Sequence, residues 1–341
     1  MPDGWLEGKV AIVTGSGRGI GRGVAMMMAS EGARVVVVDP GANLDGSGSD
    51  AGPAEQVVSE IRAAGGTAVP CLESVATVEG GEQIIKTALD NFNRVDIVVN
   101  VAGILRDRMI FNMSPEEWQA VIAVHLKGHY NTIKPASVLM RQQRWGRIIN
   151  FSSSSGLTGN AGQANYGAAK AAIAGLTRVV ARDLGRYGVT CNAIAPSAAT
   201  RMTQSVPDSA RQLRARAGIQ SAGGGALAGG TSESTATAVA APAAPTMREP
   251  EYVAPMVCFL STDFAWNING QIFAVAGGSV SVLNHPLAYK TIVKQGMWTM
   301  DELDEIVPRA LMTGTTNPAP PAPDLDVPGR PATQPEAATQ A

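Results

Sequence analysis

A run of glycines that directly follows the first apolar segment restricts the possible fold more than any other feature of the sequence. The segment KVAIVT (residues 9–14) is typical of a buried strand, and Gly15, Gly17, Gly19 and Gly21 lie between it and a helical stretch. Glycines permit a tight turn and let backbone N–H groups at the positive end of a helix approach a pyrophosphate. This order of strand, loop and helix indicates a dinucleotide-binding loop, with a loop that merely turns as the alternative.

The second apolar run, RVVVVD, ends in an acid, Asp39, eighteen residues beyond Gly21. A carboxylate at this distance can accept hydrogen bonds from the two ribose hydroxyls of NAD. The 2′-phosphate of NADP would be repelled there, at a cost of order 4 kcal/mol for a separation of 4 Å and an effective dielectric of 20. NAD is therefore the expected cofactor, while the Arg18 guanidinium, which can bind a phosphate, keeps NADP as an alternative.

Short apolar runs alternate along the chain with longer segments rich in small residues. These runs are KVAIVT, RVVVVD, TAVPC, RVDIVVN, GRIINFS and VTCNAIA. Runs that are apolar on both faces suit a parallel sheet that helices cover on two sides. We therefore expect an α/β fold, a doubly wound Rossmann-type parallel sheet in a single domain over residues 6–280.

Three segments do not fit the pattern of this domain. Residues 221–246 consist almost entirely of Ala, Gly, Ser, Thr and Pro, so burial offsets little of the entropy of ordering them, and we expect a flexible insertion. Residues 281–312 are expected to form a C-terminal extension. Residues 313–341 are rich in Pro, Ala and Thr and are expected to form a disordered tail.

Composition excludes several classes of protein. The chain of 341 residues is 45% apolar, and its net charge of −2 with no basic run gives no reason to expect nucleic acid or an anionic membrane as partner. Cys71, Cys191 and Cys258 are scattered and odd in number, and no apolar run or leader is long enough for a membrane span or export, so we expect a cytoplasmic protein. His125 and His129 lack companion ligands, so no metal site is expected.

The stretch QANYGAAK (163–170) places Tyr166 and Lys170 four residues apart, on one face of a helix. A free tyrosine ionises near pH 10, too high to exchange protons readily at neutral pH. A neighbouring positive charge favours the phenolate, which makes Tyr166 a candidate general acid or base. The alternative is an exposed tyrosine beside a solvated lysine.

Three motifs together resemble the short-chain dehydrogenase/reductase family over residues 6 to about 280: TGSGRGIG, NVAG at 100–103, and a serine thirteen residues before YGAAK. The resemblance implies an NAD-dependent enzyme in which Ser153 holds the substrate oxygen and Tyr166 exchanges the proton. Lys170 would lower the pKa of Tyr166 and hold the nicotinamide ribose. The cofactor contacts that it implies are Gly15, Gly17, Arg18, Gly19, Ile20, Gly21, Asp39, Ser74, Val75, Asn100, Ala102, Gly103, Tyr166, Lys170, Pro196 and Thr200.

The sequence departs from the family pattern at three places. Val101 replaces a second Asn, and Ser197 stands where Gly usually follows the proline, with the segment to Thr200 one residue short. His125 occupies the position where many relatives carry an Asn that orders a water in the proton relay. An imidazole can donate or accept a proton in the same way, so His125 is a fourth catalytic candidate, and a core histidine is the alternative.

Further motifs narrow the resemblance to a group within the family. AGILRDR, VHLKG, GNAGQANY, IAPSAATRMT, PEYVAP and the long connection DPGANLDGSGSD look like the (3R)-hydroxyacyl-CoA dehydrogenase domain of peroxisomal multifunctional enzyme type 2, also called 17β-hydroxysteroid dehydrogenase type 4. This implies oxidation of a secondary alcohol on a CoA thioester with a fatty or sterol chain. It also implies a homodimer or homotetramer built on the helices of residues 115–142 and 163–187.

Two other functions stay open at this point. One is an NAD-dependent dehydrogenase of free secondary alcohols such as hydroxysteroids, and the other is a dinucleotide-binding scaffold or sensor without catalysis. Residues 203–220 are expected to form a lid, with Met202, Val206 and Leu213 as substrate contacts or as ordinary core. Arginines 106, 108, 211, 214 and 216 either meet a CoA phosphate or belong to a solvated face.

Overall fold

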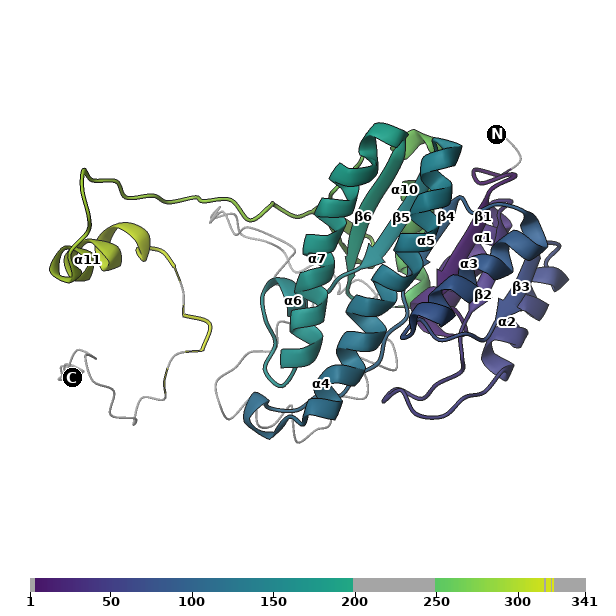
Figure 1. The fold of residues 1–341 in the computed structure, drawn as a ribbon, viewed down its shortest axis with the longest axis horizontal. Helices are drawn as coiled ribbons and strands as arrows, with labels where there is room; N and C mark the ends of the chain where they lie inside the picture. Colours follow the sequence, from purple (N-terminus) through teal and green to yellow (C-terminus); the bar gives the residue numbers. More distant parts are fainter. Residues whose placement is uncertain (1–3, 199–248, 316, 320, 322–341) are drawn as a thin grey trace, which may run out of the picture. The chain divides into compact units, whose positions relative to one another are not determined.

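The computed structural model describes residues 4–198, 249–315, 317–319 and 321 (Figure 1). Within these ranges, residues up to 284 belong to one compact unit and residues from 285 onward to a second. The expected lid at 203–220, the insertion at 221–246 and most of the expected tail lie outside the described residues. Thr200 lies outside them as well.

One sheet of eight strands runs through the first unit, in the order β3-β2-β1-β4-β5-β6-β7-β8. Neighbouring strands are parallel except β7 and β8, which pair antiparallel. The strands are β1 (Val10–Thr14), β2 (Arg34–Val38), β3 (Thr67–Cys71), β4 (Ile97–Asn100), β5 (Gly146–Phe151), β6 (Val189–Pro196), β7 (Ile272–Ala276) and β8 (Ser279–Val282). The predicted doubly wound Rossmann-type α/β fold is confirmed.

The β7–β8 pair is an addition that the apolar pattern did not indicate. β8 consists of the residues SVSV, and three of its four side chains are exposed, so it carries no run of buried residues. β7 is only partly buried. Because a strand at an open edge needs only one covered face, its sequence shows a weaker apolar signal than that of a central strand.

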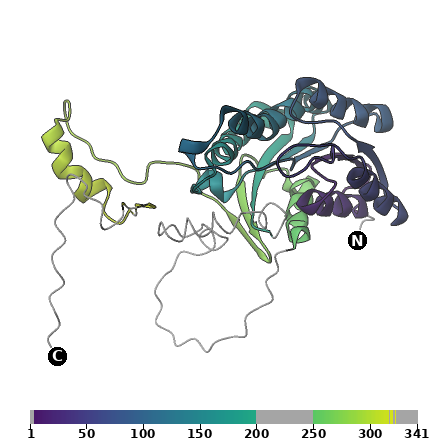
Figure 2. The ribbon, with the colours of Figure 1, turned by 90° about the horizontal axis from the view of Figure 1, so that it is seen from below.

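Helices cover both faces of the sheet, and Figure 2 shows the sheet between the two helical layers. The buried side chains of α1, α2 and α10 pack on one face, and those of α3, α5 and α7 on the other. The helices of this unit are α1 (Gly19–Ser30), α2 (Gly52–Ala63), α3 (Val78–Phe92), α4 (Pro115–Ile122), α5 (Gly128–Gln143), α6 (Ser154–Leu157), α7 (Ala164–Leu184) and α10 (Ala254–Leu260), with shorter turns η1 (Ile110–Asn112), η2 (Ala123–Lys127), η3 (Gly185–Tyr187), η4 (Pro250–Val253) and η5 (Asp263–Ala265).

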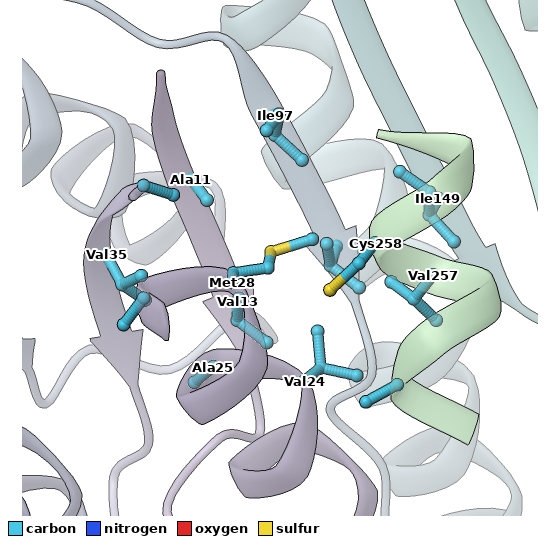
Figure 3. Close-up of a cluster of buried hydrophobic side chains, with 14 of the residues drawn as sticks. Ala11, Val13, Val24, Ala25, Met28, Val35, Ile97, Ile149, Val257 and Cys258 are labelled. Atoms are coloured by element: carbon cyan, nitrogen blue, oxygen red, sulfur yellow. The ribbon is translucent and has the colours of Figure 1, made fainter. Parts of the chain in front are cut away.

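The central strands are buried on both faces, which explains their continuous apolar sequences. In β1, Ala11 and Val13 point to the cluster that contains Met28 of α1 and Cys258 of α10 (Figure 3). Val10 and Ile12, which alternate with them, belong to the cluster on the opposite face. All five residues of β1 are buried, so no side of this strand meets water.

The register of the sheet brings the ends of three strands to one edge. Thr14 at the end of β1 pairs with Asn100 at the end of β4, and Asn100 pairs with Asn150 of β5. The Thr14 hydroxyl accepts hydrogen bonds from the backbone N–H groups of Val101 and Ala102, 3.1 Å each, and so fixes the loop after β4 beside the glycine loop. In open α/β sheets, ligands bind at this carboxyl edge of the strands.

The second unit contains α11 (Met300–Ile306) and the turn η6 (Val307–Leu311). Thr299 and Glu302 form a capping box at the start of α11, which satisfies the first backbone N–H groups of the helix. Lys294 also pairs with Glu302. In the two units as far as they are described, no helix is long and apolar enough to span a membrane.

Candidate active site

The glycine loop leads into a helix whose N-terminus has no side-chain cap. Arg18 precedes α1 in an extended conformation, its side chain makes no capping hydrogen bond, and the first turn contains no acid. The first N–H groups and the positive end of the helix dipole are therefore available to an anion. Gly15 has φ +64°, and a Cβ there would lie 2.7 Å from the Cα of Ala102, so this turn requires glycine.

We expect Gly21→Ala to weaken dinucleotide binding by at least about tenfold, because the loop tolerates no side chain there. A Cβ on Gly21 would lie 2.2 Å from the carbonyl oxygen of Gly15 and would push the loop out of shape. Calorimetric titration with NAD measures the effect. Gly278→Ala is the matched control, since a Cβ there meets nothing within 4 Å. Equal affinity in both variants would show that the turn does not carry the binding site.

Asp39 follows β2 and is held at the mouth of the site by the backbone. Its carboxylate oxygens accept hydrogen bonds from Gly17 N at 2.9 Å and from Gly41 N at 2.8 Å. The long connection after Asp39 then crosses toward the loop after β4. Leu105 N donates to Leu44 O at 2.9 Å, and Arg106 Nε donates to Asp45 O at 2.8 Å. The Arg106 side chain therefore binds the backbone of the connection after β2.

A cavity of about 320 Å³ lies between these loops, within the size range of small-molecule and cofactor sites. Thirteen of the sixteen residues that the sequence places at the cofactor line it: Gly15, Arg18, Gly19, Ile20, Gly21, Asp39, Ser74, Val75, Ala102, Gly103, Tyr166, Lys170 and Pro196. Of the other three, Gly17 does not line the cavity but donates its backbone N–H to the Asp39 carboxylate, and Thr200 is outside the described residues. Asn100 directly precedes the lining residues Val101 and Ala102 and does not line the cavity itself.

Asn100 is buried and joins three elements below the cavity. Its Nδ2 donates to Asn150 Oδ1 of β5 at 3.1 Å, and its Oδ1 accepts from the Thr132 hydroxyl of α5 at 2.7 Å. Asn150 in turn donates to the Thr177 hydroxyl of α7. Asn100 therefore holds the floor of the site in place.

Tyr166 lies in the first turn of α7 and faces the turn that carries Ser153. Burial raises the pKa of Tyr166 to about 12; a side-chain hydrogen bond with Ser153 acts in the opposite direction, and the negative charge of Asp107 adds to the rise. Ser153 precedes α6, and its Oγ also accepts a hydrogen bond from Ser155 N at 3.2 Å. Tyr166 lines the cavity, whereas Ser153 follows the lining residue Ser152 and is not itself among the lining residues.

Lys170 lies one turn further along α7 and is almost completely buried. Its Nζ donates to the carbonyl oxygen of Phe151 at 2.6 Å and lies 5.5 Å from the centroid of the Tyr166 ring. Burial lowers the pKa of Lys170 to about 7. That Lys170 lowers the pKa of Tyr166 stays a prediction; in this structure its Nζ donates to a backbone carbonyl.

His125 lies in the wide turn η2 and is buried against the cavity. Its ring meets the edge of the Tyr166 ring with centroids 5.1 Å apart, and burial and Lys170 hold its pKa well below the usual value, so it is neutral at pH 7. Nε2 lies 3.1 Å from Ile104 N and 2.9 Å from Ile104 O, so either tautomer finds a backbone partner. Nδ1 has no hydrogen-bond partner among the described residues.

Two groups of residues at this site were not assigned a role from the sequence. Part of the connection after β2 lines the cavity, namely Ala42, Asn43, Leu44 and Gly46, together with Glu73. The unusual length of that connection was its only signal. Asp107 and Gln163, which hydrogen-bond each other at 2.9 Å beside Tyr166, belong to the motifs AGILRDR and GNAGQANY, but their pairing depends on the tertiary fold.

A glycine loop that shares a cavity with a tyrosine and a lysine, with Ser153 hydrogen-bonded to the tyrosine, is typical of a class of protein, the α/β oxidoreductases that transfer hydride between an alcohol and a nicotinamide dinucleotide. Comparison with known families agrees. The model of the short chain dehydrogenase family matches residues 9–211, and the chain belongs to this family.

Individual relatives cover most of the chain. It is 41% identical over 279 residues to a 3-oxoacyl-[acyl-carrier-protein] reductase of Synechocystis, 81% of this chain and 98% of that protein. It is 38% identical to the hydroxyacyl-CoA dehydrogenase ChsB1 of Mycobacterium tuberculosis, over 87% of each chain. The peroxisomal multifunctional enzyme type 2 of Mus musculus is 38% identical over 85% of this chain, which spans only 34% of that enzyme.

A solved structure is similar too. The crystal structure of a short chain dehydrogenase from Mycobacterium avium superimposes with a TM-score of 0.74 at 42% sequence identity, and the match covers 93% of this chain and 99% of that one.

Proposed function

We propose that this enzyme oxidises the secondary alcohol of a (3R)-hydroxyacyl-CoA thioester, with a fatty or sterol chain, to the ketone and uses NAD as hydride acceptor. The observation that carries the proposal is the shared cavity, which brings Tyr166 and Lys170, with Ser153 bonded to the tyrosine, to the glycine loop and Asp39. The name of one relative, a hydroxyacyl-CoA dehydrogenase, supports the acyl-CoA substrate.

The residues present fit a nicotinamide dinucleotide. Gly15 and Gly21 leave no room for side chains beside the open end of α1, which suits the approach of a pyrophosphate. Both carboxylate oxygens of Asp39 are oriented by backbone N–H groups and keep lone pairs that can accept from ribose hydroxyls. Lys170 is the candidate for the nicotinamide ribose. When bound, the cofactor supplies the hydride acceptor.

The side chains of the protein transfer the proton of the substrate hydroxyl. In oxidation, Tyr166 as phenolate takes the hydroxyl proton of the substrate while Ser153 holds the substrate oxygen. The same groups reduce a ketone in the reverse direction, with Tyr166 as the acid. His125 is proposed to pass the proton onward through Nδ1, which has no hydrogen-bond partner within residues 4–198 and the other described ranges, since Nε2 is satisfied in either tautomer.

Asp39→Asn is expected to change the cofactor preference. The substitution removes the negative charge that would face the 2′-phosphate of NADP but keeps an oxygen to accept from Gly17 or Gly41. We expect kcat/KM for NADP relative to NAD to rise by at least about tenfold. Initial rates with both cofactors measure the ratio. If wild type already used NADP as well as NAD, with Arg18 binding the extra phosphate, the NAD assignment would be wrong.

The substrate proposal is tested by NADH absorbance with a panel of (3R)-hydroxyacyl-CoA esters, from short fatty chains to sterol side chains, beside matched alcohols without CoA. A strong preference for the thioesters supports the proposal. Equal or better turnover of free alcohols, such as hydroxysteroids, would make CoA incidental. Binding of NAD without turnover of any alcohol would indicate a scaffold or sensor.

Assembly and location remain predictions. A homodimer or homotetramer through α4, α5 and α7 is checked by light scattering of the purified protein. The cytoplasmic location expected from the sequence is checked by microscopy of a tagged chain, since the multifunctional relative has a peroxisomal name.

A further inference from the structure

A hydrogen-bond network connects the loop after β4 to the two turns that carry Ser153 and Tyr166. Gln163 is buried at its centre, immediately before α7. Its Oε1 accepts from the Ser155 hydroxyl at 2.8 Å and from Asn160 Nδ2 at 2.9 Å. With both donors on Oε1, the amide orientation is fixed and Nε2 must find an acceptor. The acceptor is Asp107 Oδ2, at 2.9 Å.

The segment around Asp107 is fastened to the start of α7 at two further points. Arg108 N donates to Gly162 O at 2.8 Å, and Asn165 Nδ2 donates to Arg106 O at 2.9 Å. These bonds fix the position of the Asp107 carboxylate relative to Tyr166. The negative charge of Asp107 is therefore held at a fixed position relative to the Tyr166 side chain.

The electrostatic surroundings of Tyr166 come from four elements. Ser153, before α6, bonds to the tyrosine and favours its phenolate. Lys170, on α7 itself, lies 5.5 Å from the ring centroid and gives its hydrogen bond to Phe151, and neutral His125 packs edge-on from η2. The loop after β4 contributes Asp107, whose negative charge disfavours the phenolate.

We propose that Asp107 is a positioning residue for the hydride-transfer reaction: its carboxylate orients Gln163, and its fixed negative charge adds to burial in favouring the neutral tyrosine that acts as the acid on a ketone. The inference rests on the proposed function and deepens it. An enzyme with this carboxylate reduces ketones over a wide pH range and oxidises alcohols fast only at higher pH. Removal of the charge shifts this balance.

Asp107→Asn separates the two effects, because its Oδ1 still accepts from Gln163 while the charge is lost. We expect the rise of the single-turnover oxidation rate with pH to move to lower pH, with about three- to tenfold faster oxidation at pH 7. The alkaline fall of ketone reduction should move in the same direction, because one tyrosine serves both reactions. Asp107→Ala loses the hydrogen bond as well and should lower both rates. Asp90→Asn, which changes an exposed acid on α3, is the control and should leave both profiles unchanged.

A measurement without substrate keeps this inference distinct from the proposed function. The Tyr166 resonance, assigned with Tyr166→Phe in protein labelled with carbon-13 tyrosine, reports the titration of this side chain directly. The proposal predicts a lower pKa for Tyr166 in Asp107→Asn than in wild type, whichever alcohol the enzyme uses. An unchanged tyrosine titration together with unmoved pH profiles would overturn it. A shifted titration with no turnover of any alcohol would support Asp107 and reject the proposed reaction.

Discussion

Replacement of Tyr166 by phenylalanine is expected to lower the single-turnover rate of alcohol oxidation by about 10²–10⁴-fold. The variant lacks only the hydroxyl, so the ring still packs against His125 while the group that exchanges the substrate proton is gone. Affinity for NAD should change little, because the glycine loop and Asp39 are untouched. Stopped-flow absorbance of NADH measures the rate, and calorimetric titration measures the affinity.

Tyr187→Phe is the matched control for this experiment. Tyr187 lies in η3, before β6 and at the opposite edge of the sheet, and its hydroxyl bonds to Arg186. Its loss should leave turnover intact. If Tyr166→Phe kept nearly wild-type turnover while binding NAD normally, the proton-transfer role of Tyr166 would be wrong.

Replacement of Lys170 by methionine is expected to have effects of opposite sign on activity and on stability. Activity should fall by a factor on the order of 10², because the cation beside Tyr166 and the candidate ribose contact are lost. The free energy of unfolding at pH 7 should rise by on the order of 2–4 kcal/mol. Burial lowers the pKa of Lys170 to about 7, so the folded protein bears a cost that an apolar side chain of similar length avoids.

The lowered pKa of Lys170 also predicts how the free energy of unfolding changes with pH. The unfolded lysine binds a proton up to its ordinary pKa of 10.5, whereas the folded one releases it near pH 7. Between these values the unfolded state binds more protons, so Lys170 makes the stability of wild type rise with pH from about 7 to about 10.5. Urea unfolding across this range should show that the rise is absent in Lys170→Met. It should persist in Lys86→Met, which changes an exposed lysine on α3. A wild-type stability that falls over this window would contradict the assignment.

The fold was predictable because its strongest signals are local. Of the six strands predicted from apolar runs, five (β1, β2, β4, β5 and β6) are buried along nearly their whole length, whereas β3, at the edge of the sheet, is partly exposed. The glycine loop lies between β1 and α1 as expected. The edge strand β8 was missed, since a short strand with exposed serines has no such run. The capping box of α4 is equally local, because Ser114 and Glu117 lie only three positions apart in the sequence.

The sequence predicted which residues line the site better than it predicted their pKa values. The spacing of Tyr166 and Lys170 places them on one helical face, but no spacing shows that the Lys170 ammonium bonds to Phe151. Desolvation depends on everything packed around a group, so the raised pKa of Tyr166 and the lowered pKa of Lys170 follow only from the tertiary structure. The hydrogen bond between Asp107 and Gln163 likewise follows only from the tertiary structure, because the two residues are 56 positions apart in the sequence.

Isotope transfer reports directly whether hydride passes from the substrate to the cofactor. A (3R)-3-hydroxyacyl-CoA that carries deuterium on C3 is mixed with enzyme and NAD under single-turnover conditions, and the reduced cofactor is analysed by mass spectrometry. We expect one deuterium in the nicotinamide for each ketone formed, and no such transfer from the (3S) epimer. Formation of the ketone with no deuterium in the cofactor, or no reaction of the (3R) thioester at all, would contradict the proposed reaction.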